Sequence, residues 1–174
     1  MSVAGPSGTV SRLEIALVKG TGEQILSDNL VGTAKWTFKT VFGLIKTKAK
    51  DWDIDLSVFE KNNFYIHSPH HAVEHEGPSG GLADVLCLIS AIKEIPINHK
   101  YAFTGEISLK GKVLAIGGVK EKLLAAQRNK METVIIPLNN KKDVEKLSKE
   151  ILGNMTIKYV DNIDEAYDFV FNNK

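Results

Sequence analysis

The segment from Leu82 to Lys93 constrains the fold more than any other part of the chain, because apolar residues occupy almost every side of its helical wheel. A helix with that distribution is stable only when other elements surround it. The chain has 174 residues, of which 43% are hydrophobic and 25% are charged. This length and composition fit one globular domain with a substantial core. We therefore expect the 82–93 helix to lie inside that core.

Strand and helix patterns alternate along the rest of the chain. Alternating apolar residues predict strands over residues 12–19, 63–68, 132–138 and 156–160. Turn residues predict two hairpins, one pairing 12–19 with 23–27 and one centred on Lys110 and Gly111. Helical spacing predicts helices over residues 30–52, 82–93, 119–130, 141–152 and 163–171. The mixture indicates an α+β fold with mixed sheets, hairpins and packed helices, and with an α/β-like C-terminal part.

Composition argues against several classes of partner. The net charge of +1 gives no electrostatic footprint for nucleic acid or for an acidic membrane surface. Arg12 and Arg128 are the only arginines, which weakens a case for bidentate phosphate or guanine recognition. No apolar segment reaches membrane-spanning length without charges.

The cysteine count and the N-terminus bear on the compartment and on the domain boundary. Cys87 is the only cysteine, so an intrachain disulfide is impossible and nothing points to secretion. We expect Cys87 to be a small core residue rather than a nucleophile. Residues 1–11 lack the apolar core of a signal peptide. They are predicted to be a flexible lead-in or an expression remnant, with the domain proper at 12–174.

Ser79 stands between Gly77-Pro78 and Gly80-Gly81, immediately before the apolar helix. The glycines allow a tight turn and a close approach to a ligand. Unpaired N–H groups at the start of a helix suit a developing oxyanion, so Ser79 is a candidate nucleophile. The alternative is that Ser79 only caps the helix. Ser7 has the same Gly-Pro-Ser-Gly context but no helix after it, and is predicted to lie in a loop.

The serine segment also fits G-x-S-x-G, the nucleophile elbow of α/β-hydrolases. That fold needs a histidine late in the chain, but His99 is the only histidine after Ser79. No strand obviously leads into the turn either. These two points argue against an α/β-hydrolase.

Lys122 is the candidate proton acceptor. On a helical wheel it shares one stripe with Val119, Leu123 and Ala126, which is the apolar face. A lysine there can snorkel, with its amine in water. Alternatively, burial lowers the pKa of the amine from about 10.4 towards 7–8, where lysine acts as a general base. Serine–lysine pairs are an established variant of the serine nucleophile.

The histidines raise the question of a metal site. His67, His70, His71 and His75 lie close together in sequence. Their spacing is poor for zinc, and no cysteine accompanies them except Cys87 in the apolar helix. We expect a solvated loop rather than a metal centre.

From about Arg12 to Phe171 the chain closely resembles the proteolytic domain of Lon, the ATP-dependent serine protease family. The resemblance rests on "GPSGG" at 77–81, "TGEISLKGKVLAIGGVKEKLLAAQR" at 104–128 and "IIPLNNKKD" at 135–143. It implies a single Lon-type proteolytic domain in which Ser79 is the nucleophile and Lys122 the general base.

The resemblance also implies supporting residues. Thr104 matches a threonine beside the dyad that would orient the lysine amine, and His67 matches one of two histidines, the other being replaced by Tyr65. Glu76 and Gly80 stand where the family commonly has aspartate and alanine.

The activity implied is that of a serine endopeptidase that degrades unfolded or damaged proteins. Family members form hexameric rings, and ATP and Mg belong to an ATPase module that this chain lacks, so no cofactor is expected here. The family places the protein in the mitochondrial matrix if eukaryotic and in the cytoplasm if bacterial. The alternatives are a catalytically idle scaffold or binding domain of the same fold, and a small serine esterase.

Overall fold

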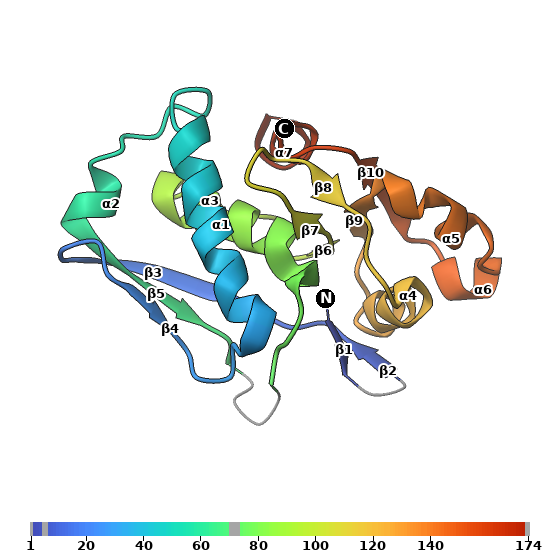
Figure 1. Cartoon of the computed structure of the whole chain (residues 1–174). Coiled ribbons are helices and arrows are strands. Elements are labelled where there is room, and N and C mark those ends of the chain that lie inside the picture. Colours follow the sequence, from blue (N-terminus) through green and yellow to red (C-terminus); the bar gives the residue numbers. More distant parts are fainter. Residues whose placement is uncertain (1, 5–6, 70–73, 173–174) are drawn as a thin grey trace.

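The structure is a computed structural model that describes residues 2–4, 7–69 and 74–172. Helices and small sheets alternate along these residues, so the predicted α+β class is confirmed (Figure 1). A three-stranded sheet lies at one end of the molecule and α5 and α6 lie at the other (Figure 1). Within the described ranges, no helix is both long and apolar enough to cross a bilayer.

The first sheet has the order β3-β5-β4 and contains β3 (Glu14–Lys19), β4 (Gln24–Leu26) and β5 (Asn62–His67). β5 runs antiparallel to β3 and parallel to β4. The predicted hairpin between β3 and β4 is therefore wrong. β5 takes the central position, where Phe64 and Ile66 are almost completely buried in the core.

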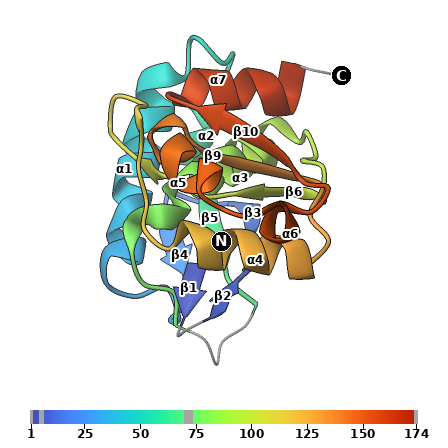
Figure 2. The ribbon, with the colours of Figure 1, turned by 90° about the vertical axis from the view of Figure 1, so that its right-hand side faces the viewer.

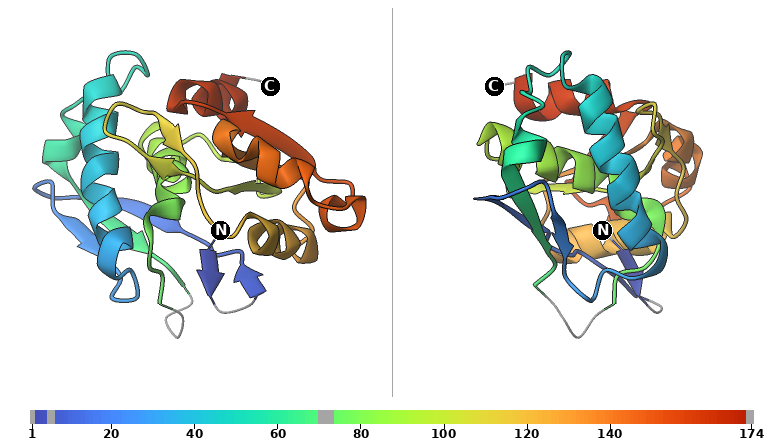
Figure 3. Two further views of the ribbon diagram at one scale, coloured as in Figure 1. Left: turned by 45° about the vertical axis from the view of Figure 1, so that its right-hand side comes forward. Right: turned by 60° about the vertical axis from the view of Figure 1, so that its left-hand side comes forward.

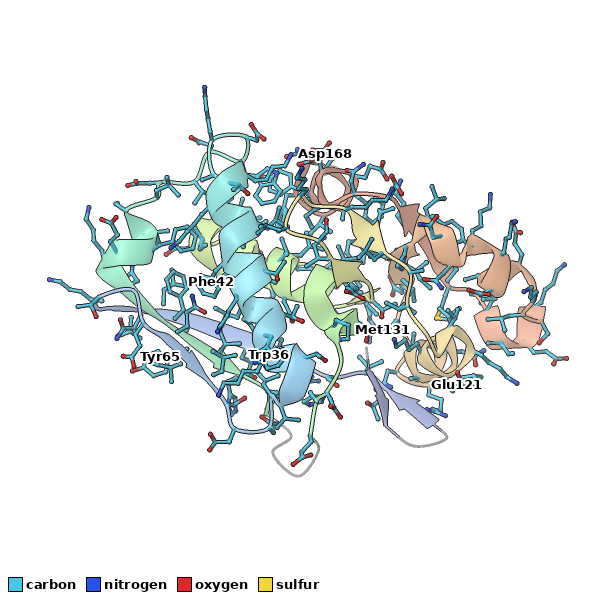
Figure 4. All side chains as sticks on the ribbon, viewed as in Figure 1. Trp36, Phe42, Tyr65, Glu121, Met131 and Asp168 are labelled. Atoms are coloured by element: carbon cyan, nitrogen blue, oxygen red, sulfur yellow. The ribbon has the colours of Figure 1, made fainter. Side chains whose placement is uncertain are left out.

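Three helices complete this half of the molecule: α1 (Gly32–Lys48), α2 (Val58–Lys61) and α3 (Gly81–Lys93). α1 packs against α3, and Figure 3 shows the two helices crossing above the first sheet. Phe42 projects from α1 (Figure 4) and meets Phe64 on β5 edge to face, with ring centroids 5.0 Å apart. α3 is buried as its sequence predicts.

The second sheet is parallel, with the order β10-β9-β6. Its strands are β6 (Tyr101–Phe103), β9 (Thr133–Pro137) and β10 (Thr156–Val160). Alternate residues of β9 serve two cores, because Ile135 belongs to the cluster around α1 and α3 while Val134 and Ile136 belong to the cluster under α4. The α/β-like C-terminal part is thus present.

The helices of this half are α4 (Val119–Arg128), α5 (Lys141–Glu145), α6 (Lys149–Leu152) and α7 (Ile163–Tyr167). A π-helical turn, Asp168–Asn172, continues α7. The single helix predicted at 141–152 is interrupted, because Ser148 adopts an extended conformation with ψ 155°. The Asn162 side chain accepts a hydrogen bond from Glu165 N and so caps α7.

Shorter elements connect the two halves. β7 (Glu106–Ile107) and β8 (Val113–Leu114) form the hairpin predicted around Gly111. Two 3₁₀ turns, Pro78–Gly80 and Leu138–Asn140, precede α3 and α5.

The N-terminal segment differs from the flexible lead-in predicted at 1–11. β1 (Ser2–Ala4) and β2 (Ser7–Thr9) pair antiparallel, and β2 packs against α4 (Figure 2). Ser7 is therefore part of a strand rather than a loop. The close packing depends on Gly8, because a Cβ atom there would lie 2.5 Å from Glu121 O. The Arg128 guanidinium also donates to Gly8 O at 2.8 Å.

Candidate active site

Ser79 lies in the 3₁₀ turn Pro78–Gly80, which leads directly into α3. Gly77 begins the turn with φ +93°, a conformation that favours glycine. The N-cap residue of α3 is Gly80, and no side chain caps this helix. Among the described residues, no hydrogen bond engages the Ser79 hydroxyl, so the alternative that Ser79 only caps the helix finds no support.

The backbone of Ser79 is held by the segment after β6. Ser79 O accepts hydrogen bonds from Gly105 N at 2.9 Å and from Thr104 Oγ1 at 3.2 Å. Leu82 N in turn donates to Gly105 O at 3.0 Å. Thr104 is fully buried. It lies beside the serine as predicted, but its hydroxyl bonds the serine carbonyl rather than the lysine amine.

Lys122 is buried on the inner face of α4, with only 3% of its surface exposed. The snorkelling alternative is therefore wrong. Burial lowers the pKa of the Lys122 amine to about 8, because the charged form loses its hydration. The amine donates a hydrogen bond to Gly117 O at 3.0 Å.

Asn140 fixes the loop that contains Gly117, whose carbonyl accepts the hydrogen bond from Lys122. Its buried side chain accepts from Ile116 N and donates to Ile116 O, both at 2.9 Å, next to Gly117. The sequence showed Asn140 within "IIPLNNKKD" but gave no sign of this role. Only the tertiary structure brings Asn140 to the start of α4.

Ser79 and Lys122 do not share a hydrogen bond among the described residues, and the amine donates to Gly117 O. Ser79 is carried by the turn before α3, and Lys122 by the first turns of α4. Their action as a pair thus stays a prediction.

A pocket of about 90 Å³ opens beside Ser79. We call it the serine pocket, and Gly80 and Glu76 line it with Ser79. Glu76 is exposed at its edge. His67 is opposite Glu14 in the β3–β5 pair and is absent from the described lining.

The sequence gave no role to Asp84, which also lines the serine pocket. A carboxylate within the apolar run "GLADVLCLIS" was the available signal. A Cβ atom built on Gly80 would lie 3.5 Å from Asp84 Oδ2, so the carboxylate lies next to the residue that follows the candidate nucleophile. Burial raises the pKa of Asp84 to about 7.

The described histidines and Cys87 form no recognisable second site. The described residues contain no group of three or more possible metal ligands among His, Cys, Asp and Glu. His70 and His71 lie outside the described residues. Burial, and then the charge of Asp84, raises the pKa of the Cys87 thiol to about 12, which suits an unreactive residue.

Comparison with known proteins identifies the family. The sequence profile of the Lon protease (S16) C-terminal proteolytic domain matches residues 1–173, and so includes the segment predicted to precede the domain. Lon protease 2 of Thermus thermophilus is 38% identical over 161 residues, 92% of this chain and 20% of that protein. Lon protease of Aquifex aeolicus is 37% identical over 161 residues, again 92% of this chain and 20% of that protein.

Lon protease of Haemophilus influenzae is 38% identical over 166 residues, 95% of this chain and 21% of that protein. The chain thus spans about a fifth of the length of these relatives. The predicted resemblance is confirmed, and the chain belongs to the Lon protease C-terminal proteolytic domain family.

Proposed function

We propose that this chain is the serine endopeptidase part of an ATP-dependent Lon-type protease, with Ser79 as nucleophile and Lys122 as general base. The observation that carries the proposal is the buried Lys122 amine. Its pKa of about 8 leaves a useful fraction neutral near physiological pH. An ordinary surface lysine is almost fully protonated there.

The reaction is acyl transfer to water. Neutral Lys122 removes the proton from Ser79 Oγ as this oxygen attacks a peptide carbonyl. The N–H groups of Ser79 and Gly80 stabilise the oxyanion. Lys122 then protonates the departing amine, and water hydrolyses the acyl-enzyme. The mechanism requires the lone pair of the neutral amine to be directed at Ser79 Oγ, while one of its N–H groups can still donate to Gly117 O.

The remaining four fifths of a Lon-type protein would supply the rest of the activity. We assign to it the ATP- and Mg-dependent unfolding of damaged proteins and the assembly of a hexameric ring. Substrates are then unfolded chains that reach Ser79 inside the ring. The compartment proposed is the cytoplasm for a bacterial protein and the mitochondrial matrix for a eukaryotic one.

The test is covalent labelling of Ser79 by a small serine-reactive phosphonate, followed by intact mass at a series of pH values. We expect one adduct on the parent chain, with a rate that rises through an apparent pKa near that of Lys122, about 8. Ser79→Ala should give no adduct, and Lys122→Met should be strongly slowed. Lys120→Met is the matched control, because Lys120 is exposed on the same helix and should label at the parent rate.

A second candidate is the catalytically idle scaffold, which is favoured by the pairing of Lys122 with Gly117 rather than with Ser79. Absence of an adduct at every pH would support it for this chain. Labelling that survives Lys122→Met unchanged would instead indicate another base, as in a small esterase.

A further inference from the structure

The walls of the serine pocket are mostly apolar. Leu13, Leu30, Ala34, Phe38 and Ala83 line it together with Ser79. A peptide whose carbonyl is attacked by Ser79 must lie at the mouth of this pocket, since the nucleophile forms part of its wall. Its volume of about 90 Å³ suits one side chain rather than a larger ligand.

One carboxylate interrupts these apolar walls. Asp84 is partly buried in the first turn of α3 and faces Gly80, as the 3.5 Å approach to a Cβ atom on Gly80 shows. Among the described residues, no hydrogen bond or ion pair engages its carboxylate. A carboxylate in apolar surroundings is costly unless an opposite charge or a donor meets it. The described side chains thus offer this carboxylate no cationic partner, and a ligand can supply one.

Ser68 is a second polar group without a partner in the same pocket. Its residue is only 2% exposed, and its Oγ has no hydrogen-bond partner among the described residues. Ser68 follows β5 and lines the pocket from another element than Asp84. The Asp84 carboxylate and Ser68 Oγ, which come from separate elements, can therefore both accept hydrogen bonds from a ligand that carries donors.

Arg12, Glu76 and His75 are the other charged or titratable groups in the described lining. Arg12 and Glu76 are exposed, and His75 contacts Ser11 Oγ through Nδ1 at 3.4 Å. The ion pairs of the described residues do not join Arg12 to Asp84. Asp84 is accordingly the one acidic group set back from the exposed rim.

We propose that the serine pocket selects a lysine or arginine side chain on the residue whose carbonyl Ser79 attacks, with Asp84 as the counter-ion. The inference rests on the proposed peptidase function. The stem of a basic side chain contacts the apolar walls. Its charged head reaches the Asp84 carboxylate in a charge-assisted hydrogen bond, with Ser68 Oγ available as an additional acceptor.

The test uses two peptides that differ only at this residue, one with lysine and one with norleucine, which has the same stem without the charge. We expect the parent chain to favour lysine in kcat/KM by at least about tenfold, the effect of one good charge-assisted contact. Asp84→Asn should bring the ratio to about one, chiefly by lowering kcat/KM for the lysine peptide. Glu74→Gln is the matched control, because it removes an exposed carboxylate outside the pocket lining and should leave the ratio unchanged.

A binding measurement separates this inference from the proposed function. The products that end in lysine or norleucine are titrated into Ser79→Ala, which cannot cleave. Tighter binding of the lysine product, lost in the Asp84→Asn double variant, supports the pocket even if no turnover is found. If norleucine is preferred, in cleavage by the parent chain or in binding to Ser79→Ala, the proposed selection of a basic side chain is refuted, while the proposed peptidase function stands. Failure of both products to bind at millimolar concentration overturns the proposed selection as well.

Discussion

Burial of Lys122 lowers both the pKa of its amine and the stability of the folded chain near neutral pH. In the folded chain burial lowers the pKa of its amine from 10.5 to about 8. Below pH 8 the amine is charged in both states, and the folded state bears the full cost of burying it. Between pH 8 and 10.5 the folded state loses this proton first, so stability rises with pH in that window.

We therefore expect Lys122→Met to stabilise the chain at pH 7, because the apolar stem is kept and the buried charge is removed. The pKa shift corresponds to on the order of 3 kcal/mol, from which other effects of the substitution subtract. Gly117 is exposed, so its carbonyl can bond water once the amine is gone. Urea unfolding at several pH values measures the free energy of unfolding of both chains. An advantage of the variant that stays constant from pH 7 to pH 10.5 would contradict the assignment.

Cys87 provides a second test at the residue scale. Its pKa of about 12 leaves few thiolates at pH 8, compared with a thiol at the ordinary value of 9.0. We expect iodoacetamide to alkylate the folded chain roughly a thousandfold more slowly than the urea-unfolded chain, since the thiolate is the nucleophile. Mass spectrometry over time gives both rates. Equal rates would show that the thiol is neither buried nor perturbed.

At the scale of elements, the two glycines after Ser79 differ in how closely other elements pack against them. A Cβ atom on Gly81 would lie 2.8 Å from Ile107 Cγ2 and 3.2 Å from Ile107 N, whereas one on Gly80 meets only ordinary contacts near Asp84. Gly81→Ala forces α3 away from β7 and should cost about 1–3 kcal/mol, the usual cost of overpacking. Gly80→Ala should fold with nearly parental stability. Thermal unfolding compares the two, and equal melting temperatures would show that α3 can shift without cost.

The elements also show what the sequence could predict. Local patterns found α1, α3, α4 and most strands, because the apolar faces of these elements repeat at short spacing. They missed the insertion of β5 between β3 and β4, since strand order depends on contacts distant in sequence. They also missed the break at Ser148, whose extended conformation a helical apolar pattern does not reveal.

For the candidate site, the sequence singled out Ser79 and placed Lys122 on the apolar stripe that it shares with Leu123, where burial was one of two alternatives. Asp84 and Asn140 could not be assigned, because their roles depend on what tertiary packing brings near them. The local sequence pattern thus indicates which residues are chemically suited to a site, but their hydrogen-bond and pocket neighbours depend on tertiary packing.

At the scale of the whole molecule, the two candidate catalytic residues belong to different cores. The turn that carries Ser79 leads into α3, in the cluster with α1 and the first sheet, while α4 carries Lys122 over the second cluster. β9 joins the two cores, with Ile135 on one side and Val134 on the other. Thr104 also links β9 to the serine turn, because its N–H donates to Ile135 O and its hydroxyl donates to Ser79 O. The position of Ser79 relative to Lys122 thus depends on how both cores pack.

The N-terminal hairpin reinforces the Lys122 side of this arrangement. Removal of residues 1–9 takes β2 away from α4 and leaves Arg128 without its acceptor on Gly8. We expect a lower melting temperature and slower phosphonate labelling of Ser79, because α4 loses part of its packing. Gly8→Ala tests the same contact in the full-length chain, since its Cβ would meet Glu121 O at 2.5 Å, and it should move both quantities in the same direction. If both variants melt and label like the parent, the hairpin is dispensable, and the sequence-based expectation of a lead-in describes these residues better than the strand pairing does.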